Sequence, residues 1–200
     1  MTFISNAYRR FGLCLLPLLA FSLPAFAHTE GGTASGFLTG FLHPLNGPDH
    51  ILAMVAVGIW GAFLGMPAIW VLPVVFPLVM ALGGAVGVMG IPLPGTEIGI
   101  ALSSVVLGLM IALAKRPPLW VAAVVVGTFA IFHGHAHGVE LPNATDPVAY
   151  SFGFVIATGL LHLSGIALGE LTRWQMGRTF IRLTGVLITC GGVAYLGGWV

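Results

Sequence analysis

The sequence predicts an all-α, polytopic integral membrane protein, and two observations support that fold class. Apolar residues make up 58% of the 200 residues and charged residues 6%, and the mean hydropathy is +1.03. A soluble domain carries roughly a quarter charged residues. Six apolar stretches are each close to the roughly 20 residues that a helix needs to cross a bilayer. These stretches, expected to be six transmembrane helices, are residues 49–65, 68–90, 97–114, 118–138, 147–169 and 179–199.

The first 27 residues have the composition of a cleaved signal peptide. Arg9 and Arg10 precede an apolar stretch, and residues 25–27 read Ala-Phe-Ala, a small-x-small cleavage site. The alternative is an uncleaved membrane helix, which two prolines and the cleavage site disfavour. We therefore expect the mature chain to begin at His28 and residues 28–200 to form the six-helix transmembrane domain.

The basic residues predict the orientation of that domain in the membrane. A cleaved signal peptide places the mature N-terminus outside, so the connections after the first, third and fifth spans face the cytoplasm. Basic residues are concentrated on the cytoplasmic side of membrane proteins. All those beyond the signal peptide lie in or beside these connections, namely Lys115, Arg116, Arg173, Arg178 and Arg182. We expect a multi-pass inner-membrane protein whose mature N-terminus and His-rich loop lie on the periplasmic side.

A break is expected in the helix that leads into the first span. A continuous helix over residues 36–65 would be about 45 Å long, too long for one crossing. Pro44 and Pro48 each remove a backbone donor. We expect a half-helix, a turn, and a new helix starting near Asp49. Broken backbone at membrane depth is tolerated only where protein or water covers it, as in the binding sites of transporters.

The segment around this break carries the first group of candidate metal ligands. His43, Asp49 and His50 offer two imidazoles and a carboxylate, which suit a divalent transition metal. The alternative interpretation is that Asp49 caps the helix and His43 bonds to a carbonyl group. Three such residues together favour a metal site.

A second group of candidate ligands lies at the outer end of the fourth span, in residues 132–140. If the helix continues, His133, His137 and Glu140 lie on one stripe and His135 faces away. If the segment is extended, the three histidines share a face instead. A solvated His-rich tract that binds metal only adventitiously is the alternative to both.

Three further residues are candidates that stand alone. His162, within the fifth span, is a candidate step along a transport pathway, or a buried hydrogen-bonding residue paired with Ser164 or Thr158. Glu97 either joins the metal site or is a carboxylate stabilised by the N-terminal dipole of its helix. His28 offers an amine and an imidazole if the signal peptide is cleaved.

The two groups resemble the signatures of the HupE/UreJ family. Residues 43–60 read HPLNGPDHILAMVAVGIW and match HPxxGxDHxLAMxxVGxW, and residues 132–140 read FHGHAHGVE and match FHGxAHGxE. A cleaved signal and six spans extend the resemblance over most of the chain. It implies a secondary permease for nickel, with cobalt as a second candidate substrate. It also implies metal-site or pathway roles for His43, Asp49, His50, Phe76, Glu97, His137 and Glu140.

Several function classes are excluded by what the sequence lacks. No basic run indicates a nucleic-acid partner, and the single lysine does not belong to a phosphate-binding loop. Two cysteines provide no disulfide framework. The HExxH motif of metalloproteases is absent, so we expect no metalloenzyme. We also expect no enzyme of another class and no organic cofactor. Imidazole and carboxylate ligands suit several divalent metals, so the choice of nickel comes from the resemblance.

The sequence thus leads to one preferred function and one alternative. The preferred function is import of Ni²⁺ across the inner membrane by facilitated diffusion, which supplies a hydrogenase or urease. Metallochaperones or maturation proteins of a nickel enzyme are the candidate protein partners. The alternative is a membrane sensor or chaperone that binds a divalent metal without net transport.

Overall fold

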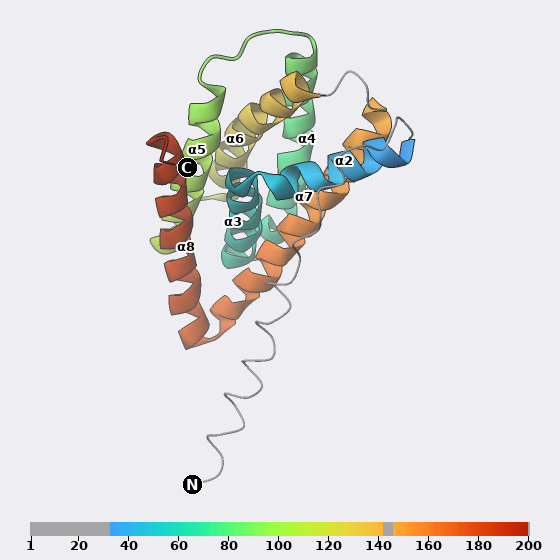
Figure 1. The fold of residues 1–200 in the computed structure, drawn as a ribbon. Helices are drawn as coiled ribbons and strands as arrows, with labels where there is room; N and C mark the ends of the chain where they lie inside the picture. Colours follow the sequence, from blue (N-terminus) through green and yellow to red (C-terminus); the bar gives the residue numbers. More distant parts are fainter. Residues whose placement is uncertain (1–32, 142–145, 200) are drawn as a thin grey trace. The chain divides into compact units, whose positions relative to one another are not determined.

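The structure is a computed structural model that describes residues 33–141 and 146–199. The expected signal peptide and His28 lie outside the described residues. Within the described residues every regular element is a helix (Figure 1). The elements are α2 (Thr33–Asn46), α3 (Pro48–Leu64), α4 (Ala68–Val88), α5 (Thr96–Ala112), α6 (Leu119–Glu140), α7 (Pro147–Gly169), the short 3-10 helix η2 (Glu170–Arg173) and α8 (Gln175–Leu196).

Each of the six predicted spans coincides with a helix, but the helices differ in length. Four of them are long and apolar enough to cross a membrane alone: α4, α6, α7 together with η2, and α8. The bent pair formed by α2 and α3 meets the same criteria when counted as one unit, whereas α5 has only 17 residues. The chain is therefore a helical membrane protein, and the count of six spans stays a prediction.

Helices α2 and α3 meet at Gly47, and their axes differ in direction by 81°. Pro48 occupies the first turn of α3, where its missing N–H group leaves no hydrogen bond unmade. Pro44 lies inside α2, near its end, and the helix continues past it to Asn46. The prediction that Pro44 breaks the helix is therefore wrong. The bend brings His43 on one helix and His50 on the other toward the same region.

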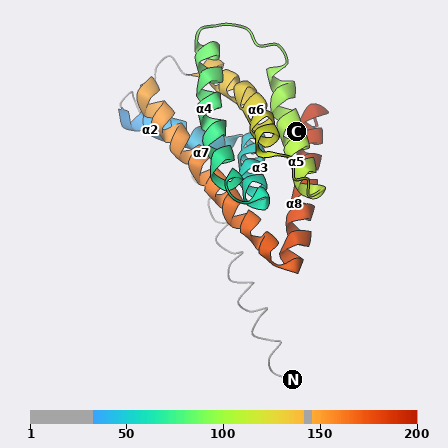
Figure 2. The same ribbon diagram turned by 180° about the vertical axis from the view of Figure 1, so that it is seen from behind.

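Helix α6 runs alongside α4 because glycines let the two backbones approach closely (Figure 2). A Cβ atom on Gly134 would lie 1.9 Å from the carbonyl oxygen of Met80. One on Gly138 would lie 2.2 Å from the carbonyl oxygen of Gly84. One face of α6 is thereby fixed against α4, and this sets the direction of the neighbouring histidines.

Helix α7 packs on α3 in the same manner, and it also packs along α2. A Cβ atom on Gly165 would lie 2.2 Å from the carbonyl oxygen of Val55. One on Gly58 would lie 2.2 Å from the carbonyl oxygen of His162. Any larger side chain at either glycine would push these two helices apart.

The described basic residues gather near one end of the bundle. The indole Nε1 of Trp60 donates a hydrogen bond to the Lys115 carbonyl at 3.2 Å, and the Arg182 Nε donates to the Ala112 carbonyl at 2.8 Å. The first bond joins α3 to the connection that follows α5, and the second joins the end of α5 to the first half of α8. Helix α6 begins at this end and its 22 residues extend for about 33 Å. Its histidines therefore lie far from the basic residues.

Candidate metal site

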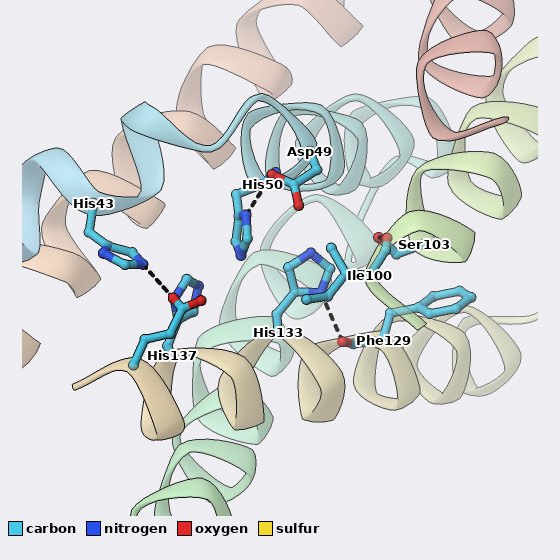
Figure 3. Close-up of polar contacts among 9 residues, drawn as sticks. His43, Asp49, His50, Ile100, Ser103, Phe129, His133 and His137 are labelled. Carbon is cyan, nitrogen blue, oxygen red and sulfur yellow. Dashed lines mark hydrogen bonds and ion pairs between the residues drawn. The ribbon is translucent and has the colours of Figure 1, made fainter. Parts of the chain in front are cut away.

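Four histidines from three helices form a continuous row that leads from the partly exposed His43 into the interior. His43 comes from α2, His50 from α3, and His133 and His137 from α6 (Figure 3). The ring centroids are 4.8 Å apart for His43 and His137, 4.6 Å for His50 and His137, and 5.1 Å for His50 and His133. The two sequence segments that carry candidate ligands thus meet in one place. We call these four histidines, with Asp49 and Glu140, the histidine cluster.

The outer part of the cluster contains three groups that are spaced to share one ion. The His43 Nε2 atom is 3.0 Å from the His137 Nδ1 atom and 3.4 Å from a carboxylate oxygen of Glu140. One ligand atom from each residue lies within 4.8 Å of the others. Ligand atoms about 2 Å from a central metal are at most about 4 Å apart, so small shifts would complete such a site. The Glu140 side chain is 57% exposed, which makes it the most accessible of the three.

Asp49 orients the imidazole of His50. Its carboxylate oxygen accepts a hydrogen bond from the His50 backbone N–H at 2.9 Å and lies 2.8 Å from His50 Nδ1. A carboxylate only accepts hydrogen bonds, so Nδ1 of a neutral His50 carries the proton and Nε2 carries a free lone pair. Metal-binding histidines commonly have such a carboxylate behind them.

His133 is held in the same tautomer by the backbone. Its Nδ1 atom lies 3.0 Å from the Phe129 carbonyl oxygen and donates to it. The side chain is fully buried. Its Nε2 atom therefore also presents a lone pair inside the protein.

Three nitrogen atoms of the cluster have no hydrogen-bond partner among the described residues. They are the Nε2 atoms of His50, His133 and His137, all buried. A buried polar atom without a partner destabilises a fold by about 1–3 kcal/mol, so three in one place indicate a ligand that completes them. Imidazole nitrogens and carboxylates are donors that fit a divalent transition metal.

A cavity of about 240 Å³ adjoins the cluster between α4, α6 and α7. His137, Tyr150 and Phe154 are among the residues that line it. The Tyr150 hydroxyl group is buried and has no described partner. The cavity gives the cluster an open, mostly apolar space beside it.

Residues 16–195 match the family described as HupE / UreJ protein. The chain belongs to the HupE/UreJ family. Protein HupE of Rhizobium leguminosarum bv. viciae is 46% identical over 182 residues, which cover 90% of this chain and 95% of that relative. No solved structure matches the chain.

Two predicted candidates of this HupE/UreJ chain lie elsewhere. Glu97 is exposed in the first turn of α5, and no described contact joins it to the histidine cluster. His162 is buried on α7, and its Nδ1 atom donates to the Met54 carbonyl oxygen. The hydrogen-bonding alternative for His162 named Ser164 or Thr158 as the partner, and these partners are wrong.

The expected His-rich loop is helical and largely buried. Helix α6 continues to Glu140, because its close packing on α4 extends to Gly138. His135 faces away from the other histidines, as the helical alternative predicts. Its Nε2 atom lies 2.8 Å from the Ile91 carbonyl oxygen, and its Nδ1 atom lies 3.3 Å from the Thr96 hydroxyl group. His135 therefore joins α6 to the connection between α4 and α5.

Two aromatic residues at this HupE/UreJ site were missed by the sequence analysis. The Phe154 ring centroid lies 4.4 Å from that of His137, and the Tyr150 ring centroid lies 5.8 Å from that of His43. These residues are four positions apart on α7, so they share one helix face. The four-residue spacing could have indicated that both aromatic residues face the site. The same spacing is common, however, among residues that only fill a core.

Proposed function

We propose that this HupE/UreJ protein imports Ni²⁺ across the inner membrane by facilitated diffusion, with Co²⁺ as a second candidate substrate. The main supporting observation is the set of three buried imidazole nitrogens without partners, which two carboxylates accompany. Nickel and its use by a hydrogenase or urease follow from the family resemblance. Metallochaperones or maturation proteins of that enzyme would receive the ion.

The ion is captured first at the exposed end of the cluster. Glu140 is accessible and negatively charged, and His43 is half-buried beside it. A carboxylate at the entrance attracts a hydrated cation and offsets its charge as water is removed. His43, His137 and Glu140 then supply the first protein ligands.

The ion moves inward along the row of histidines. His137 is the shared neighbour, because its ring lies beside both His43 and His50. Asp49 supplies the second negative charge and keeps the His50 lone pair available. Binding has to be strong enough for entry and weak enough for release, and successive ligand sets of similar strength meet both conditions.

The proposed orientation places the histidine cluster on the periplasmic side. The basic residues gather far from the cluster, and they would then face the cytoplasm in accordance with the positive-inside rule. A cleaved signal peptide over residues 1–27 would give the same orientation.

The test is radiolabelled nickel uptake into liposomes that contain the purified protein, with Co²⁺ and Zn²⁺ as competitors. Asp49→Asn and His50→Ala should each lower nickel affinity about 10- to 100-fold and abolish uptake at low nickel concentration. The control is His135→Ala, which removes a histidine from the same tract but outside the cluster. The proposal fails if the Asp49 and His50 variants transport like the control.

The same assay separates transport from sensing. A sensor or chaperone would bind nickel in a fixed stoichiometry and show no accumulation inside the liposomes. Turnover of the ion across the bilayer supports the permease, and binding without flux supports the alternative.

A further inference from the structure

His162 has the same arrangement as the histidines of the cluster, although it lies apart from them. Its Nδ1 atom lies 2.9 Å from the carbonyl oxygen of Met54 and donates to it. The Nε2 atom is buried and has no partner among the described residues, and the residue is 2% exposed. His162 therefore presents a fixed lone pair to the interior of the protein.

The bond to Met54 does not explain why a histidine is present. Met54 lies within α3, where its carbonyl oxygen already accepts the regular helical hydrogen bond from the residue four positions later. The packing of α7 on α3 is set by Gly58 and Gly165. An apolar side chain at position 162 would leave no buried nitrogen without a partner. The buried Nε2 atom without a partner therefore indicates a separate ligand at this position.

His162 lies one step further along α3 than the histidine cluster. Met54 follows His50 by four residues, which corresponds to about 6 Å along the helix axis. Phe76 on α4 connects the two places, since its ring centroid lies 5.4 Å from that of His133 and 5.4 Å from that of His162. The Phe76 side chain is fully buried.

A second polar atom without a partner accompanies His162 on α7. Thr158 precedes it by four residues, so the two side chains share one face of the helix. Thr158 is fully buried, and its hydroxyl group has no described partner. This face of α7 thus presents an imidazole nitrogen and a hydroxyl oxygen to the interior.

We propose that His162 Nε2 and Thr158 Oγ1 form an inner binding station for the transported divalent metal ion, which receives the ion from His133 past the ring of Phe76. This inference rests on the proposed function. The station consists of neutral donors, whereas the histidine cluster contains Asp49 and Glu140. Neutral donors hold a divalent cation less tightly than donors that include carboxylates, so the station favours onward release.

The decisive variant is His162→Asn. The asparagine amide nitrogen takes the place of Nδ1 and retains a donor for the Met54 carbonyl group, while the Nε2 lone pair is lost. We expect an unchanged melting temperature, unchanged equilibrium nickel binding at the histidine cluster, and an initial rate of nickel flux at least tenfold lower. If His162→Leu is defective but His162→Asn restores wild-type flux, His162 is only a structural donor and the inner station is refuted.

Thr158→Val provides a second variant that keeps the shape of the side chain. It removes a buried hydroxyl group without a partner, so the protein should be at least as stable as the wild type and should transport nickel several-fold more slowly. The control is Ser164→Ala on the same helix, where the exposed hydroxyl group donates to the Leu161 carbonyl. Equal flux in the Thr158 and Ser164 variants contradicts the proposal.

A binding measurement separates this inference from the proposed transport function. In an Asp49→Asn, His50→Ala, His137→Ala protein, which lacks ligands from both parts of the histidine cluster, equilibrium dialysis with Ni²⁺ should detect residual binding that His162→Asn removes. Loss of that residual binding supports the inner station even if wild-type liposomes accumulate no nickel. If the wild type transports nickel normally and His162→Asn changes neither flux nor residual binding, the inner station is refuted. The proposed transport function is then unaffected.

Discussion

The substitution Gly134→Ala tests whether the contact between α4 and α6 positions the histidine cluster. The added Cβ atom would lie 1.9 Å from the Met80 carbonyl oxygen, whereas ordinary van der Waals contact begins at 3.4 Å. The difference of 1.5 Å has to come from a movement of one backbone away from the other. Because Gly134 lies beside His133 and close to His137, the ligand atoms of α6 would move with it.

The size of the effect follows from two considerations. Overpacking of this kind destabilises a protein by about 1–3 kcal/mol, which for a chain of this length lowers the melting temperature by roughly 2–12 °C. Metal ligands tolerate displacements of only about 0.2 Å, so nickel uptake should fall about tenfold or more. The measurements are thermal unfolding in detergent and nickel flux into liposomes.

The matched control is Gly127→Ala on the same helix. There the nearest atom to the added Cβ atom is the Val79 Cγ2 at 3.8 Å, so no movement is required. Alanine has the higher helix propensity, by about 1 kcal/mol, and the control should equal or exceed the wild type in stability. Equal uptake by the Gly134 and Gly127 variants would show that the close contact does not position the site.

Three other outcomes are expected. Gly165→Ala should lower the melting temperature by several degrees, because its Cβ atom would lie 2.2 Å from the Val55 carbonyl oxygen. Gly159→Ala should not lower it, because no atom lies within 4 Å of the added Cβ atom. Equal unfolding curves for the two variants would contradict this prediction. Glu140→Gln should raise the nickel concentration for half-maximal uptake several-fold and leave the maximal rate of uptake nearly unchanged. The reason is that the exposed carboxylate acts in capture of the ion. A lower maximal rate with an unchanged half-maximal concentration would argue against that role. Nickel uptake should be present at neutral pH and decline as the outer pH is lowered, since only neutral imidazole ligates metal. Uptake that does not depend on pH would argue against imidazole ligands.

Local spacing along the chain predicted one half of the site. His133, His137 and Glu140 lie at helical intervals, and the structure places the whole segment in α6. The same spacing placed His135 on the opposite side, where it bonds to the Ile91 carbonyl group. Such predictions succeed because the period of an α-helix fixes which residues share a face.

The other half depends on tertiary structure, which no local pattern contains. His43 and His50 reach α6 through the 81° bend at Gly47 and the packing of α2 on α7. The local pattern placed His43 and His50 near one break, but it determined neither the bend angle nor the position of Tyr150 beside His43. It also gave His162 the wrong hydrogen-bond partners, since Met54 is 108 positions away in the chain.

The arrangement of helix ends gives Asp49 a second role. Helix α3 begins at Pro48, so the positive end of its macrodipole lies beside the histidine cluster and would repel a cation held there. Helix α6 ends at Glu140, so its negative end lies near the same cluster and would attract such a cation. These partial charges, each about half an elementary charge, oppose one another. The carboxylate in the first turn of α3 shifts that balance toward attraction, and its neutralisation in Asp49→Asn would leave the ion facing an unscreened peptide dipole.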